Sequence, residues 1–284
     1  MITLSIITVN LNNKKGLENT LQSVVNQSFN DYEYLIIDGE SLDGSKEVIL
    51  SNRHLLNYWI SEADNGIYHA MNKGIRAAKG EYCLFLNSGD WLSEPTILEK
   101  VFAQNPQADI VAGDVYFFDA KLNTIKWLIA SPSQPTAKTL FLGTLPHQAT
   151  FIRRSLFDHI GLYNEQLKIA SDWLFFEQAL LEHGCSYQHF PGTIAYFNMD
   201  GVSCDPASKS LPRREQLGVL QQKYPRFLPD YERLDTLEKQ TEQWFASREY
   251  RVYHFLERTG IIRMGVLARR FKRLIKRTLF RQNP

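Results

Sequence analysis

The sequence predicts an α/β protein with an open, mostly parallel sheet that is flanked by helices. Two observations support this prediction. Through the first hundred residues, apolar β-branched stretches alternate with amphipathic helical stretches, in the order strand, helix, strand, helix. Each strand pattern in this part ends in polar residues, and right-handed crossovers bring such parallel strand ends to one edge of a sheet. We therefore expect one ligand-binding crevice at that edge.

The predicted strands of the first half are apolar stretches bounded by turn residues. They span residues 4–9, 32–38, 56–60 and 82–86. The predicted helices repeat apolar side chains every three or four positions. The first spans residues 16–26 and the third residues 66–78. The second begins at Asp43, Gly44 and Ser45 and carries Val48 and Ile49. The polar strand ends that should converge are Asn10, Asp38, Asp64 and the pair Asn87 and Asp90.

The segment EYCLFLNSGD, residues 81–90, is the most informative of these strand ends, because an apolar run stops abruptly at Asn87-Ser88-Gly89-Asp90. Hard cations such as Mg2+ and Mn2+ prefer carboxylate and carbonyl oxygens, and they often bind through one or two carboxylates together with substrate phosphates. These residues therefore suggest a metal–diphosphate site. The alternative is an ordinary β-turn, which Asn, Ser, Gly and Asp also favour.

The second half continues the sheet and adds a candidate acid–base residue. The predicted elements are strands at 109–118, 125–129 and 149–152, a short helix that ends at Leu142, and a helix at 172–183. Ser171 is the predicted N-cap of the last helix, which places Asp172 in its first turn. An acidic residue there is favourable beside the positive end of a helix, without any further role.

The order of several spaced motifs resembles inverting family 2 glycosyltransferases with the GT-A fold. The motifs are SIITVNLN, QSVVNQSFNDYEYLIIDGESLDGS, DNGIYHAMNKGIRAAKGEYCLFLNSGD, PHQATFIRR and ASDWLFFEQAL. The resemblance covers about the first 200 residues. It implies a catalytic domain at 1–224, with a nucleotide-binding half at 1–100 and an acceptor half at 101–224.

The resemblance also implies roles for particular side chains. The expected nucleotide-binding residues are Thr8, Asn10, Asp38, Asp64 and Asn72. Asp90, assisted by Asn87, would bind Mg2+ or Mn2+ on the donor diphosphate, and Asp172 would be the general base that deprotonates the acceptor hydroxyl. His147 and Gln148 are weaker candidates for the acceptor or diphosphate site, and a loop histidine with a structural role is an alternative.

This chain departs from the family pattern at the metal motif. The family usually has Asp-x-Asp-Asp, whereas Asn87 and Gly89 leave Asp90 as the one carboxylate of the motif. Most of the metal's ligands would then come from the diphosphate. Arg153 and Arg154 are candidates for a phosphate contact, or are solvated at the start of a helix.

Charge is distributed very unevenly along the chain, although the formal net charge is only +1. Residues 258–284 hold nine basic and no acidic residues. On a helix, Leu267, Phe271 and Leu274 would lie opposite these basic residues, so we expect accessory helices at 225–284 that end in an amphipathic tail bound to anionic lipid. A tail that packs on its own domain is the alternative, and no recognition motif indicates nucleic acid.

The sequence therefore predicts an inverting, metal-assisted glycosyltransferase of bacterial cell-surface polysaccharide assembly, such as O-antigen, capsule or exopolysaccharide. The expected donor is a UDP-sugar, with GDP- and dTDP-sugars as alternatives, and the acceptor is a glycan or a lipid-linked glycan. Three cysteines without metal-like spacing and no apolar run of about 20 residues favour a cytoplasmic, peripherally membrane-bound enzyme. A sugar nucleotidyltransferase and a non-catalytic nucleotide-sugar-binding relative are the alternatives.

Overall fold

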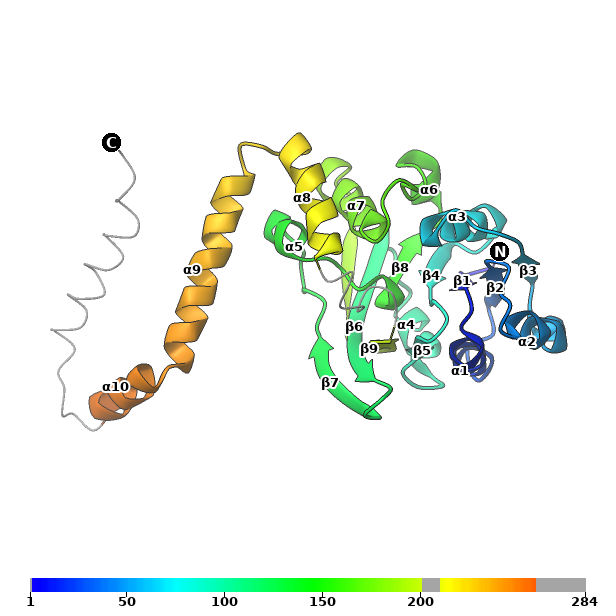
Figure 1. Ribbon diagram of the computed structural model, residues 1–284, viewed down its shortest axis with the longest axis horizontal. Coiled ribbons are helices and arrows are strands. Elements are labelled where there is room, and N and C mark those ends of the chain that lie inside the picture. Colours follow the sequence, from blue (N-terminus) through cyan, green and yellow to red (C-terminus); the bar gives the residue numbers. More distant parts are fainter. Residues whose placement is uncertain (1, 201–209, 259–284) are drawn as a thin grey trace. The chain divides into compact units, whose positions relative to one another are not determined.

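The computed structural model of the protein describes residues 2–200 and 210–258 (Figure 1). The strands are β1 (Leu4–Asn10), β2 (Tyr32–Asp38), β3 (Tyr58–Ser61), β4 (Tyr82–Phe85), β5 (Trp91–Leu92), β6 (Ile110–Asp119), β7 (Thr124–Ile129), β8 (Thr150–Arg153) and β9 (Tyr187–Asn198). The α-helices are α1 (Lys14–Val25), α2 (Ser45–Ser51), α3 (Ile67–Ala77), α4 (Ile97–Phe102), α5 (Ala137–Leu142), α6 (Ser155–His159), α7 (Ser171–Glu177), α8 (Leu211–Lys223), α9 (Leu228–Ala246) and α10 (Arg248–Arg258). Shorter turns are the 3-10 helices η1 (Arg53–Leu55) and η2 (His147–Ala149) and the π-helix η3 (Gln178–Glu182).

One mixed sheet organises the first compact unit, Met1–Leu228. Its strand order is β3-β2-β1-β4-β8-β6-β9-β5, with β7 paired to β6. The pairs among β3, β2, β1 and β4 are parallel, and β8 then runs antiparallel to both β4 and β6. The parallel part therefore places the carboxyl ends of β1, β2, β3 and β4 at one edge, as the sequence predicts.

Helices cover both faces of this sheet, and the strand sequences fit that arrangement. In β1, Leu4 and Ile6 join a core with α1, α2 and α4, whereas Ile7 and Val9 join a second core with α3, α6 and α7. Figure 1 shows α3, α6 and α7 on one side of the sheet and α1 and α2 on the other. A strand that is buried on both faces needs a nearly continuous apolar sequence, which explains the runs in β1, β2 and β4. The predicted α/β fold is confirmed.

The helix that carries Asp172 differs from its predicted form. α7 begins at Ser171 itself, so Ser171 is not the N-cap, and its buried hydroxyl has no hydrogen-bond partner among the described residues. Glu215 from α8 instead accepts hydrogen bonds from the N–H groups of residues 168–170, just before the helix. A carboxylate at this position also suits the positive end of the helix.

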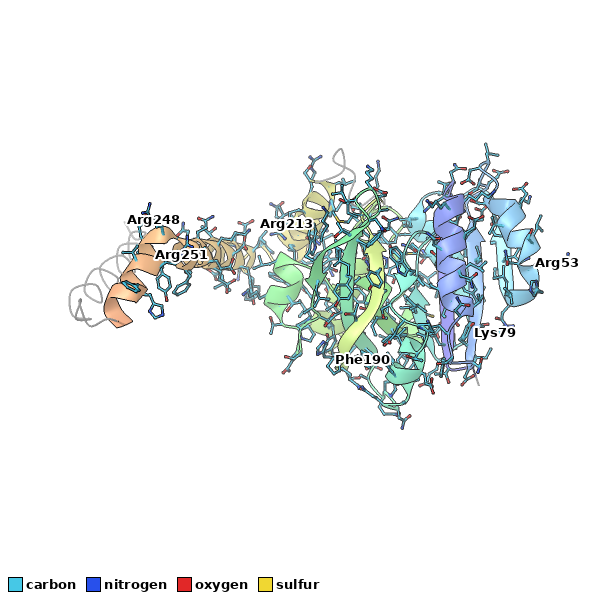
Figure 2. All side chains as sticks on the ribbon, turned by 90° about the horizontal axis from the view of Figure 1, so that it is seen from below. Arg53, Lys79, Phe190, Arg213, Arg248 and Arg251 are labelled. Atoms are coloured by element: carbon cyan, nitrogen blue, oxygen red, sulfur yellow. The ribbon has the colours of Figure 1, made fainter. Side chains whose placement is uncertain are left out.

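Buried polar contacts attach α8 to the rest of the first unit. Glu177 is fully buried, and it accepts hydrogen bonds from Lys223 Nζ over 2.7 Å and from the Tyr224 hydroxyl over 2.5 Å. Arg213 of α8, labelled in Figure 2, donates to the Phe141 carbonyl oxygen over 2.6 Å. A buried carboxylate is stable only when it is paired in this way.

The second compact unit begins at Pro229, and its described part contains α9 and α10. Within the segment 225–284, for which the sequence predicts accessory helices, residues 228–246 form α9 and residues 248–258 form α10. Arg248 and Arg251 lie on α10 (Figure 2). Within 2–200 and 210–258, no helix is both long enough and apolar enough to span a bilayer. The predicted basic tail from residue 259 on lies outside the described residues.

Candidate active site

Polar side chains meet where β1, β2 and β3 end. The strand register pairs Asn10 with Asp38 and Asp38 with Ser61. Asn10 Nδ2 donates to Asp38 Oδ1 over 2.7 Å, and Ser61 Oγ donates to Asp38 Oδ2 over 2.8 Å. The backbone N–H and the hydroxyl of Ser41 also donate to this carboxylate, over 3.0 and 2.6 Å. The predicted convergence of Asn10 and Asp38 is confirmed.

In this cluster the Asp38 carboxylate is fully hydrogen-bonded, whereas the Asn10 side-chain oxygen is not. Burial opposes the ionisation of Asp38, but hydrogen bonds from Ser41, Asn10 and Ser61 outweigh it and lower the pKa of the carboxyl. By contrast, Asn10 Oδ1 is buried and accepts no hydrogen bond within the described part of the chain. A buried acceptor without a donor is costly. A ligand N–H group would satisfy this oxygen.

Asp64 lies beside the same cluster. An ideal Cβ placed on Gly39 would lie 3.3 Å from Asp64 Oδ2 and 3.5 Å from the Asn10 carbonyl oxygen, so the three residues are close neighbours. Lys73 Nζ lies 2.6 Å from Asp64 Oδ1 and 2.7 Å from Glu62 Oε1. Burial alone would lower the pKa of Lys73, but these two carboxylates raise it. Lys73 is therefore a charged ammonium group paired with Asp64 and Glu62.

The side chains of Thr8 and Asn72 are buried and form hydrogen bonds within the protein. Thr8 is fully buried in the sheet, and its hydroxyl donates to the Leu86 carbonyl oxygen over 2.7 Å. Asn72 is also buried, and its amide donates to the Tyr163 carbonyl oxygen and to Glu165 while accepting from the Tyr163 N–H group. The structure therefore places both side chains in the interior of the first unit, and their role as nucleotide contacts stays a prediction.

The Asn87-Ser88-Gly89-Asp90 turn is anchored to β1 and α1. Its conformation needs Gly89, because φ is +104° there. The Ser88 N–H group bonds to the Val9 carbonyl oxygen, which extends the β1–β4 pairing beyond the strand. Thr20 of α1 accepts from the Gly89 N–H group over 2.9 Å and donates to the Asp90 carbonyl oxygen over 2.7 Å. The turn is thus held rigidly at the carboxyl edge of the sheet.

Asp90 is the one charged side chain of that turn, and it is only 5% exposed. Its Oδ1 accepts a hydrogen bond from the Asn198 N–H group of β9 over 2.9 Å. Burial raises the pKa of Asp90 to about 7, although the Asn198 hydrogen bond and the charge of His147 act in the opposite direction. A carboxylate with so little charge compensation is well suited to a bound cation.

A chain of side chains connects this turn to Asp172. His147 Nδ1 lies 3.1 Å from Asp172 Oδ2, and His147 Nε2 lies 3.3 Å from Asn87 Nδ2. A proton on Nδ1 lets the histidine donate to Asp172, while its other nitrogen contacts the Asn87 amide. The Tyr68 hydroxyl donates to Asp172 Oδ1 over 2.8 Å. The structure therefore brings together three residues that the sequence predicts, Asn87, His147 and Asp172.

Asp172 remains ionised in this environment. Burial would raise its pKa, but the hydrogen bond and charge of His147 and the hydrogen bond from Tyr68 hold the pKa below its ordinary value. Burial lowers the pKa of His147, and the neighbouring Asp172 and Asp90 carboxylates more than reverse that effect. Asp172 is therefore present in its ionised form, which is the form that can accept a proton.

Three contributors to the site are not indicated by the sequence: Tyr68, Thr20 and the β9 residue Asn198. The hydroxyl of Tyr68 reaches Asp172 across 104 positions, and the backbone of Asn198 reaches Asp90 across 108. The strand β9 was not predicted at all, although its sequence YQHFPGTIAYFN alternates and is rich in aromatic residues. Gln148, a predicted contact, is buried in the turn η2 next to His147.

The residues at the turn fit a divalent cation. Asn87 Oδ1 is buried and has no hydrogen-bond partner among the described residues, and Asp90 supplies the carboxylate. The part of the chain that the structure describes holds no cluster of three or more histidine, cysteine or acidic side chains that could bind a metal. Two oxygen ligands suit Mg2+ or Mn2+ when phosphate oxygens and water complete the coordination.

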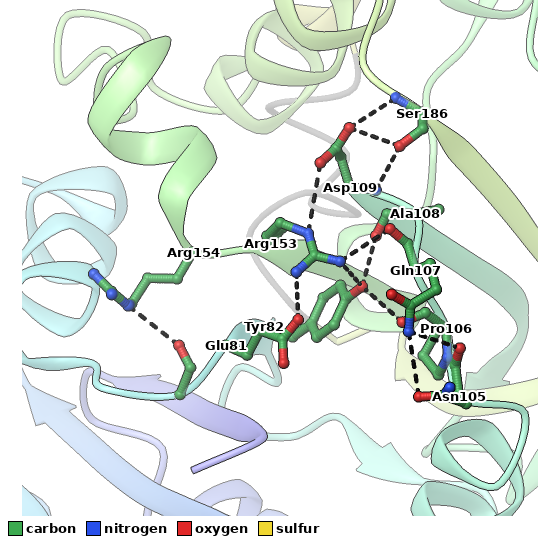
Figure 3. A network of polar contacts seen from close by, with 11 residues as sticks. Glu81, Tyr82, Asn105, Pro106, Gln107, Ala108, Asp109, Arg153, Arg154 and Ser186 are labelled. Carbon is green, nitrogen blue, oxygen red and sulfur yellow. Dashed lines mark hydrogen bonds and ion pairs between the residues drawn. The ribbon is translucent and has the colours of Figure 1, made fainter. Parts of the chain in front are cut away.

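Arg153 lies at the opposite edge of the sheet. It pairs in register with Tyr82, the first residue of β4. Its guanidinium contacts Glu81, donates to the Tyr82 hydroxyl over 2.8 Å and lies 3.5 Å from Asp109 (Figure 3). The interpretation of Arg153 as a phosphate contact is wrong, because β8 runs antiparallel to β4 and carries its end away from the site.

Replacing Arg153 with Met is expected to lower the free energy of unfolding by about 1–2 kcal/mol, because several partly screened polar contacts are lost. Turnover should stay within about twofold. Urea unfolding and a transfer assay measure the two effects. Arg154→Met is the matched control, because Arg154 makes a 3.2 Å bond to the Gly80 carbonyl oxygen and a 3.9 Å contact with Asp158. Loss of turnover without loss of stability would restore the phosphate interpretation.

Sequence comparison identifies the family. The profile described as "Glycosyl transferase family 2" matches residues 5–180. The chain belongs to glycosyl transferase family 2. A relative from Mycobacterium bovis named "PGL/p-HBAD biosynthesis glycosyltransferase" is 29% identical over 229 residues, which cover 76% of this chain and 86% of that protein. A "Cholesterol galactosyltransferase" from Borreliella burgdorferi is 31% identical over 158 residues, covering 53% of this chain and 44% of that one.

Solved structures show that this family 2 glycosyltransferase has the GT-A fold. Staphylococcus aureus TarS 1-349 in complex with UDP-GlcNAc superposes with a TM-score of 0.56 at 19% identity, covering 69% of this chain and 58% of that one. The mannosyltransferase PcManGT from Pyrobaculum calidifontis, in complex with GDP-Man and Mn2+, gives 0.53 at 14% identity, covering 99% and 88%. Family membership makes the chain a glycosyltransferase and not a sugar nucleotidyltransferase.

Proposed function

We propose that this glycosyltransferase moves a sugar, with inversion, from a nucleotide-sugar donor to a cell-surface glycan or its lipid-linked precursor. The chain of contacts from Asn87 through His147 to Asp172 is the observation that supports this most directly. It places a candidate base and a candidate metal site on opposite sides of one histidine. An inverting transfer needs the base and the leaving diphosphate on opposite faces of the donor sugar, and this separation is compatible with that requirement.

In this proposal Asp172 accepts the proton of the acceptor hydroxyl. The bond between the acceptor oxygen and the anomeric carbon forms as the bond to the diphosphate breaks, so no covalent enzyme intermediate is needed. Tyr68 and His147 hold the two carboxylate oxygens through their hydrogen bonds. Asp90 and Asn87 would hold Mg2+ or Mn2+, which neutralises charge on the leaving diphosphate.

The donor nucleotide is proposed to lie over the ends of β1 and β2. The unsatisfied Asn10 Oδ1 offers an acceptor for a base N–H group, and Asp64 with Lys73 borders the same region. The relatives' structures contain UDP-GlcNAc or GDP-Man, and a UDP-sugar is our first choice of donor. The nine basic residues of 258–284 support a lipid-linked acceptor at an anionic membrane surface.

A thermal-shift screen of UDP-, GDP- and dTDP-sugars, each with and without Mn2+, tests this function. A donor at about 100 times its Kd should stabilise the protein by roughly 2.7 kcal/mol. We expect one nucleotide to raise Tm, and to do so more strongly with Mn2+ than without it. ADP-glucose serves as the comparison ligand. If no donor raises Tm, or if EDTA leaves the shift unchanged, the proposed donor or metal site is wrong.

A further inference from the structure

A cavity of about 300 Å3 lies next to the candidate base. The residues that line it come from the start of α3 and from the loop that precedes α7. They are Asn65, Gly66, Ile67, Tyr68, Glu165, Leu167 and Lys168. Tyr68 forms part of the wall, and its hydroxyl donates to Asp172 Oδ1 over 2.8 Å. The cavity is thus one side chain away from the carboxylate.

The two oxygens of Asp172 contact two different parts of the site. Oδ2 contacts His147, whose other nitrogen contacts Asn87 of the proposed metal site. Oδ1 contacts Tyr68 and, through it, the cavity. In an inverting transfer the acceptor oxygen attacks the anomeric carbon directly, and the base contacts the acceptor hydroxyl on the face of the donor sugar away from the diphosphate. Because the His147 side leads to the diphosphate, the Tyr68 side is left for the acceptor.

The chemistry of the cavity wall suits a sugar ring. Ile67, Leu167 and the Tyr68 ring give an apolar surface of the kind that packs against the C–H groups of a pyranose. Glu165, Lys168 and the Asn65 amide provide acceptors and donors for hydroxyl groups. The wall is also held in place, because Asn72 donates to Glu165 over 2.8 Å and Glu215 accepts from the Lys168 N–H group over 2.8 Å.

We propose that this cavity binds the sugar unit of the acceptor that carries the attacking hydroxyl. The proposal rests on the proposed function, with Asp172 as the base. It makes Tyr68 a positioning residue, which orients the carboxylate while its ring supports the acceptor sugar. An acceptor that lacks a ring to fill the cavity would be a poor substrate.

Leu167→Trp and Ile67→Trp test the proposal by filling the cavity. Ile67 is 39% exposed, so a larger side chain there should not disrupt the core. The assay measures transfer from the donor found in the thermal-shift screen to a panel of octyl glycosides. We expect kcat/KM for the accepted glycoside to fall by about tenfold or more, while the donor Kd changes by less than about twofold. Leu55→Trp on η1, which is also 39% exposed, is the matched control.

Other outcomes separate the two proposals. Unchanged kcat/KM in both tryptophan variants would overturn the acceptor assignment. A parallel loss of donor affinity would also overturn it, because the cavity would then hold part of the donor. If the unsubstituted protein binds no nucleotide sugar with Mn2+, the proposed function fails, and the acceptor assignment fails with it.

Discussion

Replacing Asp172 with Asn is expected to lower kcat by about 100-fold or more and to leave the donor Kd nearly unchanged. The carboxylate is ionised in the folded protein and held by Tyr68 and His147, so the amide keeps the shape of the site but cannot accept a proton. Initial rates of transfer at saturating donor and acceptor, together with donor binding by calorimetry, measure the two quantities separately.

The control for this variant is Asp158→Asn on α6. Asp158 is 68% exposed on its side chain, and its ion pair with Arg154 is long, at 3.9 Å. We expect the control to retain full turnover. An Asp172→Asn enzyme that keeps more than about a tenth of its turnover would assign the base to another group. The candidate would then be His147, whose Nδ1 lies 3.1 Å from Asp172.

The parts of the site that the sequence could predict are those encoded by strand ends. A parallel sheet that is buried on both faces requires apolar strands, and the first polar residue marks where each strand emerges at the edge. Asn10, Asp38 and Asn87 were found in this way, and the structure places Asn10 and Asp38 in adjacent register positions. The sequence also indicated the position of Asp172 in the first turn of α7.

Contacts that depend on distant pairing could not be predicted in this way. Nothing in the local sequence of Tyr68 indicates that its hydroxyl meets Asp172, and the Asn198 N–H group reaches Asp90 only because β9 inserts between β6 and β5. Thr8 lies two residues before the end of β1, on the same face of the strand as Asn10, and its side chain is fully buried. Its assignment to the nucleotide pocket stays a prediction.

Replacing Asp90 with Asn is expected to have opposite effects on the metal-free and the metal-bound protein. Asp90 has a pKa of about 7 in the fold against an ordinary value of 3.8. The folded protein therefore binds this proton more tightly, and its stability falls as pH rises from about 4 to about 7. Above that range the ionised carboxylate costs about 4 kcal/mol. Without metal, Asp90→Asn should therefore raise Tm at pH 8, and raise it less at pH 5.5.

With Mn2+ and donor present, the same variant should be less stable than the unsubstituted protein. Asp90 supplies the negative charge of the proposed metal site, whereas Asn87 supplies only an amide oxygen, so Asp90→Asn should reduce the metal-dependent rise in Tm more than Asn87→Ala does. Asn87→Ala should also show no comparable pH-dependent gain in stability, because Asn87 does not ionise.

Thermal unfolding at the two pH values, with Mn2+ and donor or with EDTA, measures all four combinations. Equal losses in the two variants, or full activity in EDTA, would contradict the metal assignment. If Asp90→Asn raises Tm equally at both pH values, burial does not hold Asp90 protonated. The ionised carboxylate would then carry no cost for a bound cation to relieve.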